Sequence, residues 1–419
     1  MGNRSSSVQP SGPPPLLSAA VVGNIDNFGT LWTGEESFKV RDGQGNNVLH
    51  ALFSCRGDGK SNCSEMLNQI HDSLSGSLLT KVYSARNTIG CTPLWILVAY
   101  GNVSLLKEVR QKFAGEEKMD HFLEILRQNN KQGDSPLLAT CSQGNVDMVR
   151  FLKEEILSSD QFNAAISTSN KNGTSPLQII VGNNHASLLD YMLREEEILV
   201  RSQLLNLNKA GLSLFHICSE RNAHEILKTI LTFATKKESN KGDDELLKQV
   251  LSLKDRNGAN ALHVAAFCGN TESVQVWISV IKEIHPDKEI SRKESIISLL
   301  DILDGEGRTA YWLGMLQGRD QIGKLLADEG VNTSNPKMVK EIEDAQQHRS
   351  KGAKSKKKPS RTIDGSALIN ESVAEAASKN TNQKLKNIAA AFLKMKADDT
   401  KGGGCSCRPA DHCASCDEQ

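Results

Sequence analysis

Residues 87–102 read NTIGCTPLWILVAYGN, and this stretch decides the fold. Asn87 followed by Gly90 predicts a tight turn, because an Asx side chain bonds nearby backbone and glycine accepts a positive φ. Thr92 and Pro93 are typical of a helix start, where the hydroxyl caps the helix and proline loses no hydrogen bond. The Gly-Asn pair at the end of the stretch predicts the end of that helix. One turn followed by one short apolar helix is therefore expected here.

The same pattern recurs along most of the chain. The turn sequence Asx-x-x-Gly occurs seven times, at 42–45, 87–90, 130–133, 170–173, 208–211, 255–258 and 304–307. A second turn signal, Gly-Asn or a variant of it, follows eleven residues after the Gly in six of these units. Units of this kind are too small to bury their own apolar faces, so they stack and bury them jointly. The repetition predicts an all-α array.

The repeated unit resembles the ankyrin repeat, whose signature is D-x-x-G-x-T-P-L-H-x-A-A-x-x-G-H. The agreement is clearest at residues 258–266, which read GANALHVAA. The resemblance covers roughly residues 16–331, with residues 16–24 as an N-terminal cap. It implies an all-α, ankyrin-type solenoid of seven to eight elongated helix-turn-helix repeats over 13–335. It also implies recognition of other proteins rather than catalysis.

The repeats are longer than those of the family. Their Gly-to-Gly spacings run from 38 to 49 residues, against about 33 in the usual repeat. The residue four positions before each Asx is apolar in all seven units: Phe38, Tyr83, Leu126, Ile166, Leu204, Leu251 and Leu300. We therefore expect a third, short helix before each turn.

One set of candidate partner-binding residues shares a position in four consecutive units. Two residues before the turn glycine stands Lys131, Lys171, Lys209 or Arg256. Stacking would align the four on the turn tips as a basic stripe. Two interpretations stay open: a site for an acidic partner, or simply the lysine that is common at this point of ankyrin repeats.

The array offers no catalytic motif. H-E-x-x-H, G-x-S-x-G and carboxylate pairs at fixed spacing are missing, and residues 57–61 (GDGKS) lack the first glycine of a P-loop. His50, His216 and His263 stand at the histidine position of the ankyrin signature, where the resemblance implies hydrogen bonds to neighbouring turns. The sequence therefore predicts a chain that is not an enzyme and needs no metal or cofactor.

Both ends carry possible membrane signals. Residues 1–6 (MGNRSS) match the pattern for N-myristoylation at Gly2 within a disordered lipidation segment, 1–12; the alternative is a merely polar start. A basic disordered linker is expected at 336–365, where seven basic and no acidic residues occur between 349 and 361: Arg349, Lys351, Lys354, Lys356, Lys357, Lys358 and Arg361. This run is interpreted as a solvated linker, an import signal, or a contact with an anionic membrane that supplements a weak myristoyl anchor.

Two further segments follow the basic run. An amphipathic helical segment is expected at 366–400, either docked on its own protein or bound to a membrane or a partner groove. The tail 401–419 contains Cys405, Cys407, Cys413 and Cys416. These cysteines could be palmitoylated, bind zinc, or have no role. A truncated ankyrin-type palmitoyltransferase is a weaker alternative, since the D-H-H-C core and membrane helices of such enzymes are missing.

The charge balance limits the function. The chain has 50 basic and 50 acidic residues, of which 16 and 11 lie in 337–419, leaving 34 and 39 in 1–336. A uniformly basic binder of DNA or RNA is thereby excluded. Without a long apolar run or signal peptide, a cytoplasmic, possibly peripheral-membrane, monomeric array is expected. The leading interpretation is a scaffold or adaptor tethered by myristoylation and the basic tail. The alternative is a nuclear or cytosolic regulator with a zinc-binding tail.

Overall fold

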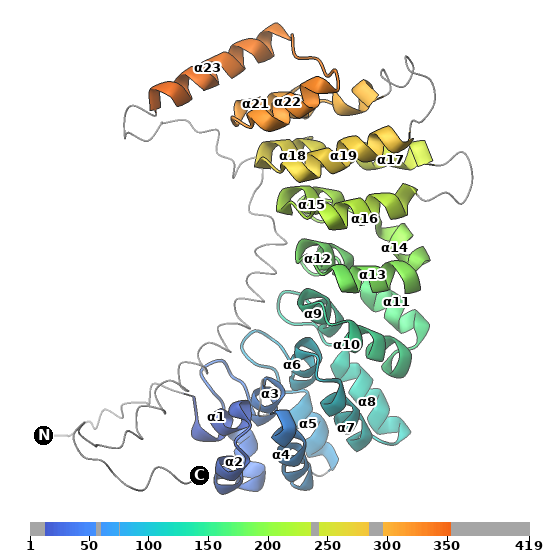
Figure 1. Cartoon of the computed structure of the whole chain (residues 1–419). Helices are drawn as coiled ribbons and strands as arrows, with labels where there is room; N and C mark the ends of the chain where they lie inside the picture. Colours follow the sequence, from blue (N-terminus) through green and yellow to red (C-terminus); the bar gives the residue numbers. More distant parts are fainter. Residues whose placement is uncertain (1–12, 56–59, 75, 236–242, 285–295, 353–419) are drawn as a thin grey trace, which may run out of the picture.

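The computed structural model describes residues 13–55, 60–74, 76–235, 243–284 and 296–352. All regular structure within these ranges is helical, so the predicted all-α class is confirmed for the described chain. The helices stack into a curved array that begins at α1 and ends at α23 (Figure 1).

A first row of helices lines the concave side of the array (Figure 1). Each helix of this row contacts the next one in the row. Because the members from α3 to α18 each lie between two others of the row, these short helices are buried on nearly all sides. The row consists of α1 (Pro15–Val22), α3 (Val48–Phe53), α6 (Pro93–Tyr100), α9 (Pro136–Gln143), α12 (Pro176–Gly182), α15 (Leu214–Arg221), α18 (Ala261–Cys268) and α21 (Ala310–Leu316).

A second row of helices packs behind the first. Its members have one apolar side toward the core and one polar side toward solvent, as expected for helices at a surface. They are α2 (Ile25–Leu31), α4 (Lys60–Asp72), α7 (Val103–Lys112), α10 (Val146–Phe151), α13 (Ala186–Glu195), α16 (His224–Thr235), α19 (Thr271–Ile284) and α22 (Asp320–Asp328). In the α10 unit the π-helix η3 (Leu152–Ile156) extends the second-row helix.

A third row of short helices precedes the turns, as predicted. It consists of the 3₁₀ helix η1 (Gly34–Lys39), α5 (Gly76–Tyr83), α8 (Glu116–Leu126), α11 (Ser159–Ser167), α14 (Glu197–Gln203) and α17 (Asp243–Ser252), and residues 296–300 are helical at the corresponding place. The seven apolar residues four positions before each Asx are all buried. They anchor this row to a hydrophobic core that is continuous from Leu16 to Val331.

Local sequence explains where the first-row helices begin and end. The Thr92 hydroxyl accepts a hydrogen bond from the Trp95 N–H at 3.1 Å, and Pro93 occupies the first helical position. Gly101 ends the helix in the left-handed conformation with a φ of 73°. The first-row helices from α3 to α21 all begin with a side-chain cap of this kind, from Asn, Ser or Thr.

The prediction of a disordered linker from residue 336 is wrong over its first part. The chain forms α23 (Pro336–Gly352), which contacts α21. Asn335 caps its start by accepting hydrogen bonds from two backbone N–H groups, and Met338 and Ile342 bury their side chains against Trp312. Tertiary burial of two apolar residues thus orders a segment whose composition is mostly polar.

Arg349 consequently does not belong to a free basic run. Its guanidinium donates to the carbonyl oxygens of Leu316 at 2.8 Å and Met315 at 3.2 Å. These carbonyls lie at the end of α21, where the last turn of a helix has unsatisfied acceptors. Arg349 therefore fastens α23 to the array.

Several predicted segments lie outside the described residues. These are the lipidation segment 1–12, most of the basic linker, the amphipathic segment 366–400 and the tail 401–419. The predictions for Gly2, Lys354, Lys356, Lys357, Lys358, Arg361, Cys405, Cys407, Cys413 and Cys416 therefore stay predictions. Lys351 lies in α23 near its end.

Candidate functional site

Each turn of the array is held by its own Asx side chain. In the turn at 130–133, Asn130 Oδ1 accepts hydrogen bonds from the backbone N–H groups of Gln132 and Asp134, both at 2.9 Å. Gly133 closes this turn with a φ of 81°, a conformation that glycine adopts without strain. The residue after the Asx is left at the exposed tip.

Backbone hydrogen bonds join successive tips. The lysines at three tips donate their N–H groups to carbonyl oxygens of the preceding turns, at 3.0 to 3.1 Å: Lys131 to Ile89, Lys171 to Gln132 and Lys209 to Asn172. The Arg256 guanidinium donates to the Lys209 carbonyl and continues the connection to a fourth turn. The tips are therefore held in register, one per layer of the stack.

The structure places the four predicted partner-binding residues on successive tips. Lys131, Lys171, Lys209 and Arg256 are all exposed, and none of them forms an ion pair with another residue of the described ranges. Thr88 takes this position in the preceding turn, and Gly305 takes it in the following one. We call these four residues the basic stripe.

The carboxylate nearest the start of the stripe points into the protein. Asp134 is 2% exposed. Its carboxylate accepts hydrogen bonds from the side-chain amides of Asn130 at 3.0 Å and Asn170 at 2.9 Å. Because this carboxylate is buried and hydrogen-bonded inside the protein, Asp134 does not form an ion pair with the cations of the stripe.

Sequence reasoning missed Arg86, which lies beside the first cation of the stripe. Its guanidinium donates to the carbonyl oxygens of Gly90 at 3.1 Å and Asn129 at 2.9 Å, and to Gln128 Oε1 at 3.0 Å. Arg86 thereby joins two neighbouring turns. The signal in the sequence was an arginine directly before the Asx of its turn.

The three signature histidines make the hydrogen bonds that the resemblance implied. In each one Nε2 lies 3.0 to 3.1 Å from a backbone carbonyl oxygen of the following unit: His50 from Cys91, His216 from Ala259 and His263 from Arg308. Burial lowers the pKa of all three, that of His50 to about 4. They are neutral at pH 7 and join units of the stack.

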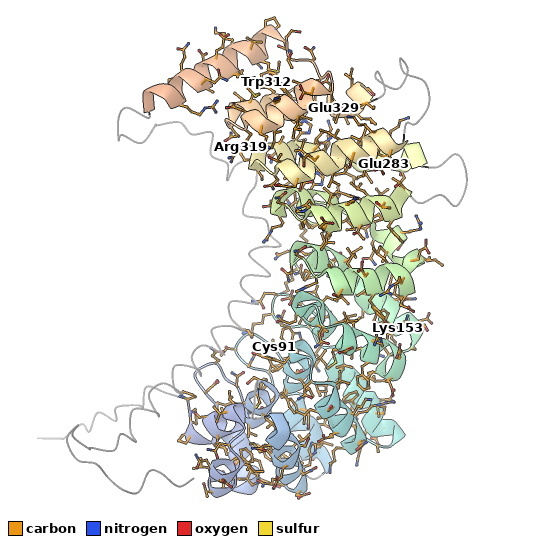
Figure 2. All side chains as sticks on the ribbon, viewed as in Figure 1. Cys91, Lys153, Glu283, Trp312, Arg319 and Glu329 are labelled. Atoms are coloured by element: carbon orange, nitrogen blue, oxygen red, sulfur yellow. The ribbon has the colours of Figure 1, made fainter. Side chains whose placement is uncertain are left out.

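The cysteines of the array are buried thiols. Five of the six in the described ranges are buried, and Cys268 is half-buried. Burial raises the pKa of Cys141 to about 12 and that of Cys268 to about 11. Figure 2 shows Cys91 among the side chains of the stack. No group of three or more His, Cys, Asp or Glu suited to a metal ion occurs in the part of the chain that the structure describes.

None of the described helices combines the length and the apolar character needed to cross a bilayer.

Comparison with curated proteins finds a relative over part of the chain. No family model matches the sequence. The chain is similar to the NAD-dependent deacetylase sir2B of Dictyostelium discoideum, with 20% identity over 195 residues. The match covers 44% of this chain and 24% of the relative, so it spans about a quarter of the relative's length.

This similarity contradicts the prediction that the chain is not an enzyme. The prediction rested on missing short motifs, and such motifs detect only active sites whose residues lie close together in sequence. Catalytic groups from distant segments leave no such motif, because the fold brings them together. We therefore no longer exclude catalysis, and the deacetylase activity itself belongs to the relative.

Proposed function

We propose that this protein is an interaction scaffold whose stacked units form an ankyrin-type solenoid. Three features support the fold assignment: seven Asx-x-x-Gly turns, capped helix starts, and a first row in which each helix contacts the next. An array of this kind offers an extended surface built from many units.

The basic stripe is the observation that carries the proposal. Its four cations are exposed, lack ionic partners among the described residues and are held in register by the tip hydrogen bonds. Leu207, two residues before Lys209, is 45% exposed and adds apolar surface to this turn. A preordered row of like charges attracts and orients an oppositely charged partner. We therefore propose an acidic, extended protein segment as the partner.

Reversal of the stripe charges tests this proposal. The variant K131E/K171E/K209E/R256E is expected to bind a fluorescent oligoglutamate peptide at least about fourfold more weakly than the wild type, because each of the four exposed ion pairs contributes about 0.2–1 kcal/mol. Fluorescence anisotropy at low salt measures the affinity.

The matched control reverses four exposed lysines away from the stripe: Lys112, Lys118, Lys228 and Lys324. Both variants have the same net charge, so a general electrostatic effect would weaken binding equally. Equal losses in the two variants would refute the stripe as the binding site.

We further propose that Gly2 myristoylation tethers the scaffold to membranes. The match of residues 1–6 to the acylation pattern supports it, as does the basic run beyond α23, since one acyl chain alone binds membranes weakly. Substitution Gly2→Ala is expected to move most of the protein from the membrane to the supernatant fraction of lysed cells. The same distribution for wild type and variant would remove the tether from the proposal.

A further inference from the structure

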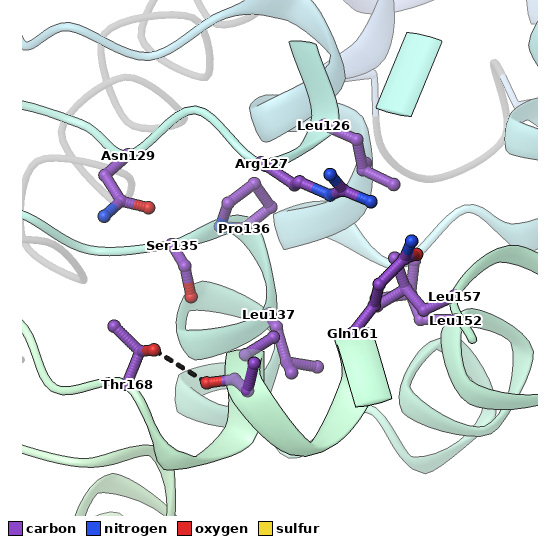
Figure 3. A pocket seen from close by; sticks show the side chains of 12 residues that line it. Leu126, Arg127, Asn129, Ser135, Pro136, Leu137, Leu152, Leu157, Gln161 and Thr168 are labelled. Carbon is purple, nitrogen blue, oxygen red and sulfur yellow. Dashed lines mark hydrogen bonds between the residues drawn. The ribbon is translucent and has the colours of Figure 1, made fainter. Parts of the chain in front are cut away.

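A pocket of about 360 Å³ opens between α8, α9, η3 and α11 (Figure 3). Its walls are mainly apolar and include Leu126, Leu137, Leu152, Leu157 and Ala165. Three of these leucines are at most 5% exposed. The pocket lies in the lower size range of small-molecule sites, which span about 300–1,000 Å³.

The neighbouring layer shows why this space is open. Between α5 and α8, the rings of Tyr83, Phe113 and Phe122 fill the interior, with successive centroids 5.3 and 5.5 Å apart. Between α8 and α11, the α11 side of the pocket carries the small side chains of Ala164 and Ala165.

The π-helix η3 forms a second wall of the same pocket. The Leu157 N–H donates to the Leu152 carbonyl oxygen at 2.8 Å across this wide turn, and both leucine side chains line the cavity. Single π turns inside α-helices occur frequently at functional sites.

The polar residues of the pocket favour an anion. No acidic residue lines it. The hydroxyl oxygen of Ser135 accepts from the Leu138 N–H, and that of Thr168 donates to the Ala164 carbonyl (Figure 3, dashed line). The Ser135 oxygen and the Thr168 O–H are thus each used in a hydrogen bond at a helix end.

Two donors lie together at the other end of the pocket. The side chains of Arg127 and Gln161 lie at the same end in Figure 3. Gln161 Oε1 accepts from the Ser158 N–H at 3.3 Å, which directs its NH₂ group away from that bond. Arg127 makes no ion pair with any described residue.

We propose that this pocket binds a medium-chain carboxylate, a ligand that nothing in the proposed scaffold function requires. The alkyl chain lies against the leucines and Ala165, and the carboxylate accepts hydrogen bonds from Arg127 and Gln161. At about 30 Å³ for each water-sized group, the volume holds on the order of ten non-hydrogen atoms. Octanoate has this size, and its charge lies at one end, as the pocket requires.

Titration of the full chain with octanoate and with 1-octanol tests the site. The methyl signals of Leu137, Leu157 and Ala165 in NMR spectra are expected to shift with saturation in the wild type. Arg127→Gln is expected to weaken the binding of octanoate at least about tenfold, because a hydrogen bond to a charged group contributes about 1.5–3 kcal/mol. The same variant should leave octanol binding unchanged, since octanol carries no charge.

A second variant, Ala165→Leu, fills the pocket and is expected to abolish binding of both ligands. Its thermal unfolding is compared with that of the wild type to show that the fold is intact. The proposal is overturned if octanoate fails to shift these signals, if Arg127→Gln weakens both ligands equally, or if a folded Ala165→Leu variant binds like the wild type. The oligoglutamate assay of the basic stripe is independent of all these outcomes.

Discussion

Acidification from pH 7 to pH 4.5 is expected to lower the free energy of unfolding by about 5 kcal/mol through two histidines. Burial lowers the pKa of His50 and of His71 to about 4 each, with smaller contributions from nearby Arg41 and Lys112. In the unfolded chain both groups return to a pKa of about 6.5. The contribution of these two neutral histidines to the free energy of unfolding is therefore present above pH 6.5 and is lost as the pH falls toward 4.

Two more buried histidines act in the same direction. The pKa values of His216 and His263 are also lowered, mainly by burial, so protonation again favours the unfolded chain. Urea-induced unfolding at pH 7 and at pH 4.5 measures the loss. Equal stability at both pH values would contradict the prediction.

The chain itself provides a matched control for this effect. Gln178 stands at the position of the signature histidines, and its Nε2 donates to the Leu212 carbonyl oxygen at 3.0 Å while Oε1 accepts from the Ser175 N–H. The substitution His50→Gln should preserve both kinds of hydrogen bond without a titrating group. On acidification, we expect the free energy of unfolding of this variant to fall by about 2 kcal/mol less than that of the wild type.

Substitution Asp134→Ala is expected to reduce the free energy of unfolding by about 3–5 kcal/mol. The carboxylate accepts side-chain hydrogen bonds from two different turns, through Asn130 and Asn170. Its removal breaks both bonds and leaves two buried amide donors without an acceptor. Chemical unfolding at pH 7 measures the change.

Thr174 provides the control, because it occupies the same position in the next turn. It is fully buried, and its hydroxyl has no hydrogen-bond partner among the described residues. Thr174→Val keeps the shape, breaks no hydrogen bond and removes a buried hydroxyl that has no partner, so the free energy of unfolding should not fall. If Asp134→Ala and Thr174→Val lowered the free energy of unfolding by similar amounts, the position in the turn, rather than the hydrogen bonds of Asp134, would determine the loss of stability.

Much of the fold could be predicted from local sequence. The turns at positions such as 130–133 and the helix starts such as Thr92 depend on residues at most four apart, whose side chains bond their own backbone. The apolar residue four positions before each Asx predicted the third row of helices. The alignment of Lys131, Lys171, Lys209 and Arg256 also follows from equal position in stacked units, and its role in binding stays a prediction.

The tertiary structure alone decided the features that depend on contacts between units. A polar segment forms α23 because Met338 and Ile342 pack against Trp312, which lies more than twenty residues away in the sequence. The pocket exists because Ala165 and the π turn at Leu152 meet between two layers. Local patterns determine turns, caps and the repeat, because their bonds are short-range. Burial, cavities and the burial-induced lowering of histidine pKa values depend on neighbours that only the folded array brings together.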